Sequence, residues 1–272
     1  MRTIVHISDI HFGKIDYAIA ERLREKIVEI KPHLIIVSGD LTQRARAAQF
    51  IEARAFLDTL PSPQIVVPGN HDVPLYNVVK RFTAPLDKYK KYITENLQPF
   101  FADEEIAVIG INTARSLTIK DGRINREQIA AVCEKMCPLP NEMLKIVVTH
   151  HPFDLPANHI DETDLVDNAE RAMQRFAECG TDVFLSGHLH VSHISETASR
   201  YKLESGHNAL VIQAGTATST RGRGEPNSFN VIEFENPRLT AKRFECENSE
   251  SNFVLAATQE FLQNKNGWAK SA

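Results

Sequence analysis

Five short apolar segments of this chain each lead, within three residues, to an aspartate, asparagine or histidine. The segments are TIVHI, LIIVS, QIVV, KIVVT and VFLS, and the groups that follow them are SDIH, GD, GNHD, HHP and GHLH. Such runs have the length and composition of buried strands. In an open α/β sheet the functional crevice lies beyond the carboxyl ends of the strands, so we expect these polar side chains to converge in space.

Helix-period segments alternate with the apolar runs through the first two thirds of the chain. Strands are predicted at residues 3–7, 34–38, 64–67, 106–112, 145–149 and 183–186, with helices near 15–30, 45–60 and 168–178 and another opening at Arg126. This order is typical of an α/β protein with a largely parallel sheet. Beyond Val191, residues 193–197, 209–213, 229–234 and 239–244 predict antiparallel strands that form a second sheet edge.

The predicted domain covers residues 1–245. Residues 73–105 form a helical, irregular insertion that we expect near the functional site. Residues 246–272 are predicted to form a C-terminal helix, at 253–262, and a polar tail.

The composition sets limits on partners and compartment. A net charge of -4 and a pI of about 6.3 give no general attraction to nucleic acid, which usually meets a basic face. No apolar run is long enough for a membrane span, and the cytoplasm is the expected location. The four cysteines (Cys133, Cys137, Cys179 and Cys246) are too irregularly spaced for a disulfide framework and are expected to be reduced.

The candidate metal ligands are the polar side chains at the strand exits: Asp9, His11, Asp40, Asn70, His150, His188 and His190. Each motif alone is also compatible with helix capping or ordinary turn chemistry. Taken together, carboxylates, an amide and imidazoles without a thiolate suit Mn²⁺, Fe or Zn²⁺. Seven ligands exceed one coordination sphere and match two divalent ions about 3.5 to 4 Å apart that share a carboxylate.

The strand-exit motifs resemble, in the same order, the five motif blocks of the calcineurin-like metallophosphoesterase superfamily. They read SDIH, SGDL, PGNHD, THHP and SGHLH. The sequence looks most like its bacterial class III cyclic nucleotide phosphodiesterase group. The resemblance implies a four-layer α/β/β/α sandwich of two mixed sheets flanked by helices. It assigns Asp9, His11, Asp40 and His190 to one ion, and Asp40, Asn70, His150 and His188 to the other.

The same resemblance implies roles around the metals. His71 would donate a proton or stabilise charge at the leaving group, and Asp72 would orient its ring. The first histidine of the HHP motif is the ligand, so His151 is expected to act behind the ligands or in the fold. Arg221 and Arg223, in a glycine-rich loop at 215–228, are candidate substrate contacts that are equally compatible with a solvated connection.

The expected activity is hydrolysis of a small phosphorylated substrate by attack of a metal-bridging hydroxide. The resemblance to the phosphodiesterase group favours phosphodiesters, including cyclic nucleotides, over phosphomonoesters or nucleotide and lipid-linked pyrophosphates. A nuclease is less favoured because the chain lacks a basic character. A non-catalytic scaffold is disfavoured because every expected ligand is present. A homodimer is expected by analogy alone.

Overall fold

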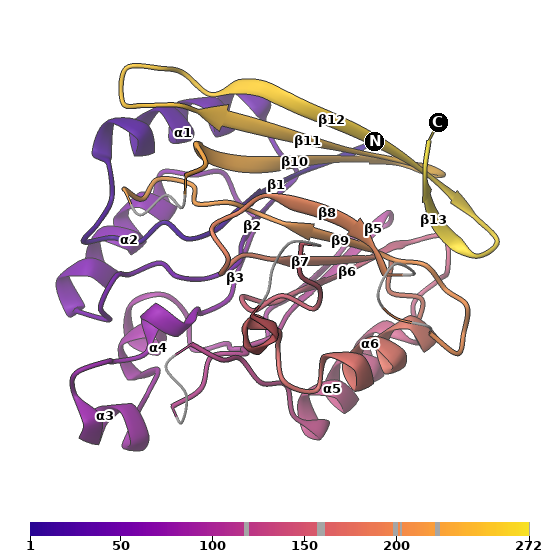
Figure 1. Cartoon of the computed structure of the whole chain (residues 1–272), viewed down its shortest axis with the longest axis horizontal. Helices are drawn as coiled ribbons and strands as arrows, with labels where there is room; N and C mark the ends of the chain where they lie inside the picture. Colours follow the sequence, from indigo (N-terminus) through magenta and orange to yellow (C-terminus); the bar gives the residue numbers. More distant parts are fainter. Residues whose placement is uncertain (117–119, 157–160, 198–200, 202, 221–223, 272) are drawn as a thin grey trace.

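The computed structural model describes residues 1–116, 120–156, 161–197, 201, 203–220 and 224–271, and two β-sheets form its centre (Figure 1). The seven-stranded sheet has the order β13-β12-β11-β10-β1-β2-β3, and the six-stranded sheet has the order β4-β5-β6-β7-β9-β8. The strands are β1 (Arg2–Ile7), β2 (Leu34–Val37), β3 (Gln64–Val66), β4 (Phe100–Ala102), β5 (Ile106–Gly110), β6 (Leu144–Val148), β7 (Val183–Ser186), β8 (His193–Glu196), β9 (Leu210–Gln213), β10 (Asn227–Glu235), β11 (Arg238–Cys246), β12 (Val254–Asn264) and β13 (Gly267–Lys270).

Of the six helices in the described residues, four connect parallel strands and cover the outer faces of the sheets, and the other two lie between β3 and β4. The helices are α1 (Tyr17–Ile30), α2 (Ala47–Asp58), α3 (Val78–Thr83), α4 (Asp87–Tyr92), α5 (Arg126–Met136) and α6 (Ala169–Glu178), with short 3-10 turns at Asn70–Asp72 and Glu162–Asp164. Helix α1 illustrates how local sequence sets the ends of an element. The Asp16 side chain accepts hydrogen bonds from the first-turn amides of Ala18 and Ile19, and Lys31 ends the helix in a left-handed conformation.

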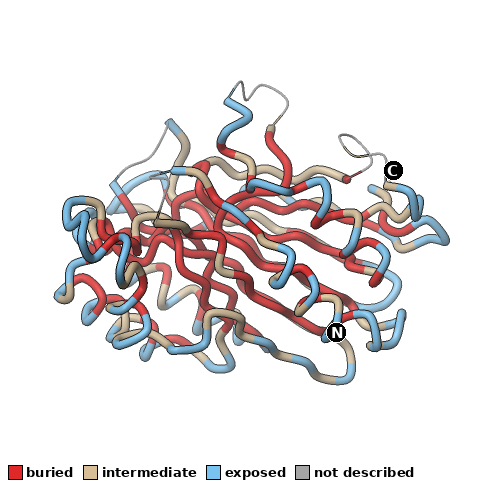
Figure 2. The backbone as a smooth tube through the Cα atoms, turned by 90° about the horizontal axis from the view of Figure 1, so that it is seen from below, coloured by how far each residue is buried: buried red, intermediate tan, exposed pale blue. Residues whose placement is uncertain are grey.

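Three apolar cores hold the layers together. Ile4 on β1 lies in the core between the two sheets, with Ile36 on β2 and Val148 on β6. The next residue of β1, Val5, faces the opposite side and packs in the core that contains Leu23 of α1. A third core joins the six-stranded sheet to α5 and α6. Figure 2 shows the strands buried along the middle of the molecule and exposed segments around its rim. The predicted α/β/β/α sandwich of two mixed sheets is confirmed.

The predicted helix at 253–262 is wrong. This segment lies in strand β12, which pairs antiparallel with β11 from Leu262 opposite Arg238 to Val254 opposite Glu245. Periodicity alone does not separate a short apolar helix from a strand. The segment forms a strand because its backbone hydrogen-bonds with the edge of β11, which would otherwise be unpaired. This pairing also buries Phe261 against the inter-sheet core.

The strands beyond Val191 are divided between the sheets instead of forming one edge. β8 and β9 complete the six-stranded sheet, where β9 runs parallel to β7, whereas β10 and β11 extend the seven-stranded sheet next to β1. The expectation that all cysteines are reduced is also corrected, since Cys137 and Cys179 form a disulfide. Within the described part of the chain, no helix is long and apolar enough to cross a membrane.

Candidate metal centre

The five strand exits meet at one edge of the two sheets, as the pattern of apolar runs predicts. Asp9 and His11 follow β1, Asp40 follows β2, and the 3-10 turn at Asn70–Asp72 follows β3. The second sheet contributes the residues that follow β6 and β7. All seven predicted ligands are thereby brought together, although their roles as ligands stay predictions.

The backbone at these exits is conformationally unusual. In the described residues, eight non-glycine positions have a positive φ, and five of them are predicted ligands: Asp9, His11, Asp40, His188 and His190. Each such conformation costs on the order of 1 kcal/mol or more and persists only where the surroundings enforce it. The concentration of strained residues in one place marks a functional site.

One group of ligand atoms comes from Asp9, His11, Asp40 and His190. Their donor atoms all lie within 4.8 Å of one another, and the residues are buried. Nε2 of His190 is 3.2 Å from Oδ1 of Asp9, and Nε2 of His11 is 3.7 Å from Oδ2 of Asp40. Among the described residues, Oδ1 of Asp9 is buried and forms no hydrogen bond despite the nearby His190 nitrogen, and Nδ1 of His11 is buried without a hydrogen-bond partner.

The second group surrounds Asn70. Its Oδ1 lies 3.0 Å from Nε2 of His150 and 3.1 Å from Nδ1 of His188. Nε2 of His150 is also 3.4 Å from Oδ2 of Asp40, the oxygen that faces His11 in the first group. Asp40 therefore lies between the two groups.

The protonation of His150 follows from its other ring nitrogen. Nδ1 is 2.8 Å from the carbonyl of Ser38 and must donate to it, because a carbonyl oxygen only accepts. Nε2 of His150 faces the oxygens of Asn70 and Asp40, so a positive charge, either a proton on Nε2 or a metal ion, is needed where these three atoms converge. Burial lowers the pKa of His150, but the Asp40 charge outweighs it and the pKa rises to about 9.

Asp40 shows the matching perturbation. Burial raises its pKa, yet His150, His71 and His11 outweigh this effect and hold the pKa well below its usual range. Both shifts reflect the same demand for positive charge at this point. Buried oxygen and nitrogen donors with one unpartnered carboxylate oxygen fit divalent metal ions.

Residues behind the ligands fix their orientation. Ser8 Oγ donates to Oδ2 of Asp9 at 2.6 Å, and the backbone N–H of His71 donates to Oδ1 of Asp40 at 2.8 Å. Thr216 Oγ1 lies 2.7 Å from Nδ1 of His190. These contacts turn the remaining atom of each ligand toward the centre.

Asp164 is a site residue that the sequence pattern did not single out. It is buried on the loop between β6 and α6, and its Oδ1 lies 3.5 Å from Nε2 of His188. Since Nδ1 of His188 faces Asn70, Asp164 holds the other side of the ring. It is one of several acidic residues at 154–167, a segment without a recognisable motif. Only the folded structure shows which of these residues contacts a candidate ligand.

The role of Asp72 in orienting the His71 ring stays a prediction. The Asp72 carboxylate accepts hydrogen bonds from the backbone N–H groups of Gly69, Leu41 and Thr42 and so fixes the loops that carry the ligands. Burial is the main cause that raises the pKa of Asp72, to about 6. The His71 ring places Nδ1 3.0 Å from the Gln43 carbonyl, which therefore orients it.

His151 is buried, and both of its ring nitrogens contact neighbouring residues. Its Nε2 donates to the Lys120 carbonyl at 2.7 Å, and its Nδ1 accepts from Thr113 Oγ1 at 2.8 Å. It lies near His150 and His188, but with both nitrogens engaged it has no lone pair for a metal. Burial lowers its pKa well below the usual range, so the ring is neutral. Arg221 and Arg223, the candidate substrate contacts, lie outside the described residues.

This fold, with two sheets and strand-end loops that bear clustered Asp, Asn and His side chains, is that of the metallophosphoesterases. Residues 2–192 match the calcineurin-like phosphoesterase family, and the chain belongs to it.

Two curated relatives are both described as phosphodiesterases. Over 201 residues the chain is 25% identical to a probable glycerophosphodiester phosphodiesterase from Arcobacter nitrofigilis, a match that covers 69% of this chain and 71% of that protein. Over 134 residues it is 24% identical to a probable cyclic nucleotide phosphodiesterase from Ruthia magnifica subsp. Calyptogena magnifica, a match that covers 42% of this chain and 56% of that protein.

Solved structures share the fold at low identity. A purple acid phosphatase from yellow lupin seeds has a TM-score of 0.71 at 11% identity, covering 95% of this chain and 53% of that one. Vacuolar protein sorting 29 from Cryptosporidium parvum has a TM-score of 0.51 at 14% identity, covering 96% of this chain and 98% of that one. The chain thus spans about half the length of the plant phosphatase.

Proposed function

We propose that this chain hydrolyses phosphodiesters at a two-metal centre. The observation that carries the proposal is the position of Asp40, whose Oδ2 is 3.7 Å from Nε2 of His11 and 3.4 Å from Nε2 of His150. A carboxylate oxygen between two groups of nitrogen and oxygen donors is what a ligand shared by two ions requires. One ion would be held by Asp9, His11, Asp40 and His190, and the other by Asp40, Asn70, His150 and His188.

The donor set favours Mn²⁺, Fe or Zn²⁺, because it contains carboxylate, amide and imidazole groups and no thiolate. Two such cations, when bound, lower the pKa of water toward neutrality and neutralise charge on phosphoryl oxygens. The contribution of the protein is to hold the ligands in fixed positions, through the hydrogen bonds from Ser8 to Asp9 and from the His71 amide to Asp40.

His71 is suited to assist the leaving group. Its side chain is half-buried, and its ring meets the edge of His11 with a centroid distance of 5.0 Å. Because Nδ1 donates to the Gln43 carbonyl, the imidazolium form of His71 would give the proton on Nε2 to the departing alkoxide and leave a neutral imidazole.

Two arguments favour a small diester over other phosphate esters. Both curated relatives are described as diesterases, one for glycerophosphodiesters and one for cyclic nucleotides. The net charge of -4 opposes a long polyanion such as nucleic acid. Phosphomonoesters and pyrophosphates are the alternative substrates, since metals recognise only the phosphoryl group.

The test is hydrolysis by metal-stripped protein with Mn²⁺ restored. The substrates are bis(p-nitrophenyl) phosphate, p-nitrophenyl phosphate, cyclic AMP and glycerophosphoethanolamine. We expect Mn²⁺-dependent cleavage of the diesters, with the last two substrates separating the two diesterase classes. Cleavage of the monoester alone would make the protein a phosphatase, and equal rates with and without metal would contradict the proposal.

A further inference from the structure

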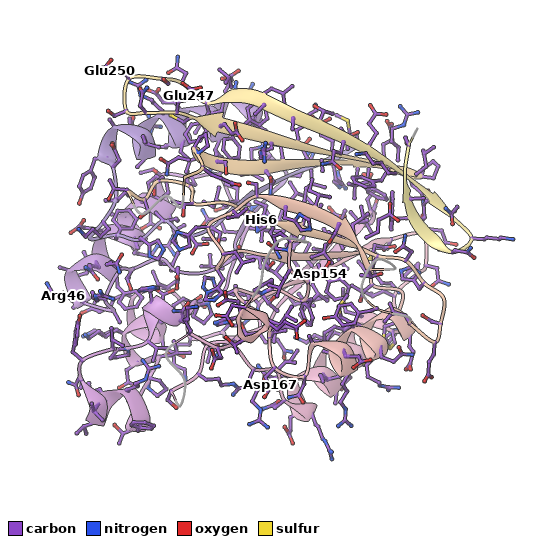
Figure 3. All side chains as sticks on the ribbon, viewed as in Figure 1. His6, Arg46, Asp154, Asp167, Glu247 and Glu250 are labelled. Carbon is purple, nitrogen blue, oxygen red and sulfur yellow. A yellow bond between two sulfur atoms is a disulfide. The ribbon has the colours of Figure 1, made fainter. Side chains whose placement is uncertain are left out.

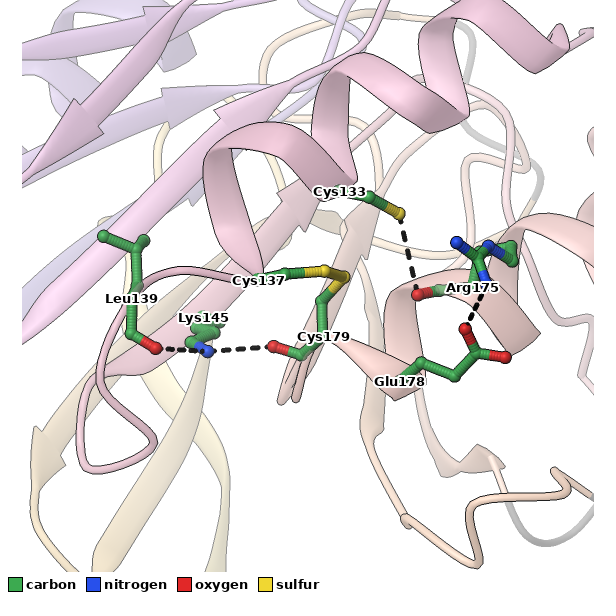
Figure 4. Close-up of a disulfide and its surroundings, with 7 residues drawn as sticks. All are labelled: Cys133, Cys137, Leu139, Lys145, Arg175, Glu178 and Cys179. Carbon is green, nitrogen blue, oxygen red and sulfur yellow. Dashed lines mark hydrogen bonds and ion pairs between the residues drawn. A yellow bond between two sulfur atoms is a disulfide. The ribbon is translucent and has the colours of Figure 1, made fainter.

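Three cysteines gather at the edge of the six-stranded sheet opposite the candidate metal centre. Cys133 lies on α5, Cys137 ends that helix, and Cys179 ends α6 (Figure 4). The neighbouring strands β6 and β7 begin here, whereas His150 and His188 follow their far ends. The cluster is therefore separate from the site described above.

The three sulfur atoms are close enough to act together. Their Sγ atoms all lie within 4.8 Å of one another, so Cys133 stands beside the Cys137–Cys179 disulfide with a thiol of its own. Cys133 is half-buried, and its Sγ lies 3.7 Å from the carbonyl of Arg175. In α5 the spacing from Cys133 to Cys137 is one helical turn, which puts both on the side that faces α6.

The surroundings hold the two helix ends in place around the sulfurs. Nζ of Lys145 donates to the carbonyls of Leu139 and Cys179, at 3.0 and 2.8 Å, and so ties the segment after α5 to the end of α6 (Figure 4). These contacts do not involve the disulfide. They therefore restrain the ends of α5 and α6 independently of that bond.

We propose that Cys133, Cys137 and Cys179 in their reduced state form a three-thiolate site for one thiophilic metal ion, such as zinc, that alternates with the disulfide. A phosphine or dithiol reductant supplies two electrons to the disulfide, whose sulfurs then take up two protons. Metal binding releases the thiol protons. With Zn–S bonds of about 2.3 Å, tetrahedral ligands lie roughly 3.8 Å apart. The sulfurs of Cys137 and Cys179, which are bonded to each other in the disulfide, therefore move apart by side-chain rotation when they share an ion.

Spectroscopy distinguishes this site from the candidate metal centre, which has no sulfur ligand. The full-length protein is reduced with a phosphine, freed of the reagent without oxygen, and titrated with Cd²⁺. We expect thiolate-to-metal charge-transfer absorption whose final amplitude corresponds to one Cd²⁺ ion bound by three thiolates per chain. It should be absent from the oxidised protein, and Cys133→Ser should weaken Cd²⁺ binding at this site by at least about tenfold. Cys246→Ser, at the buried cysteine on β11, is the matched control and should retain it.

Alkylation of the reduced wild-type protein gives a second readout that does not depend on the variants. Bound Cd²⁺ should protect Cys133, Cys137 and Cys179 together from iodoacetamide, as read by mass spectrometry. Reduced protein without thiolate absorption would overturn the proposal. Protection of only Cys137 and Cys179, or unchanged binding in Cys133→Ser, would likewise overturn the three-thiolate site.

Discussion

Oδ2 of Asp40 lies 3.4 Å from Nε2 of His150, at the meeting point of loops that follow strands of two different sheets. The contact joins the two halves of the candidate metal centre. A buried carboxylate and a buried imidazole in this relation are stable together only with a proton or a metal ion between them. The raised pKa of His150 and the depressed pKa of Asp40 result from the attraction between these two groups.

His71→Ala should retain bound metal and lose turnover. General acid catalysis contributes about 10²- to 10⁴-fold, and the loss should be largest for diesters with poor leaving groups. Rates across a series of aryl phosphodiesters measure this dependence. His207→Ala is the control, because its Nε2 bonds the Thr181 carbonyl at the far edge of the sheet. Equal slowing across the series would argue against proton donation.

Asp164→Asn should weaken metal binding or activity by about 10- to 100-fold, as expected when the partner of a ligating histidine is altered. Asp161→Asn is the matched control, because both carboxylates contact Lys120 but only Asp164 is buried against His188. Metal titration by calorimetry compares the two variants. Equal affinities would remove Asp164 from the site.

Gly39 has no room for a side chain. Its φ is +99°, and an added Cβ would lie 2.7 Å from Nδ1 of His150. Gly39→Ala should therefore lower stability by more than the roughly 1 kcal/mol cost of the left-handed conformation alone, and should displace His150. Gly206→Ala, with φ +68° and open space around it, isolates the conformational cost. Equal unfolding free energies in the two variants would contradict the steric argument.

His6 makes stability depend on pH. It lies between the sheets (Figure 3), with Nε2 2.9 Å from Ser38 Oγ, and burial lowers its pKa from 6.5 to about 3, an effect that Asp9 only partly opposes. Below pH 6.5 His6 is protonated in the unfolded chain but stays neutral in the folded chain. The free energy of unfolding is therefore highest above pH 6.5 and falls by about 1.4 kcal/mol per pH unit below it.

His6→Gln should remove this dependence. The free energy of unfolding of metal-free protein at about pH 7 and about pH 4.5 measures it, and the wild type should lose about 2 to 3 kcal/mol more than the variant over that range. Parallel losses in both proteins would show that His6 is protonated in the fold.

The sequence predicted which polar side chains converge because each of them lies just beyond the end of a buried strand. The strand ends fix where Asp9, Asp40 and His150 lie, so local pattern was enough to expect their convergence. The partners of those ligands were harder to predict. Asp164 comes from a loop without a motif, and the group that orients His71 is the backbone carbonyl of Gln43, which any residue would supply.

Long-range pairing explains the remaining errors. Strand β12 forms because it pairs with the free edge of β11, and the sequence of residues 253–262 alone does not indicate this partner. Cys137 and Cys179 are separated by 42 positions and meet only because α5 and α6 pack side by side. Spacing along the chain does not report such a contact.

The most direct test of the two-metal centre is the metal content of Asp40→Ala beside the wild type, measured by mass spectrometry after reconstitution with Mn²⁺. The wild type should hold about two ions per chain, whereas the variant should lose at least one and most of its diesterase activity, because a single oxygen faces both groups of ligands. Two ions and full activity in the variant would contradict the account.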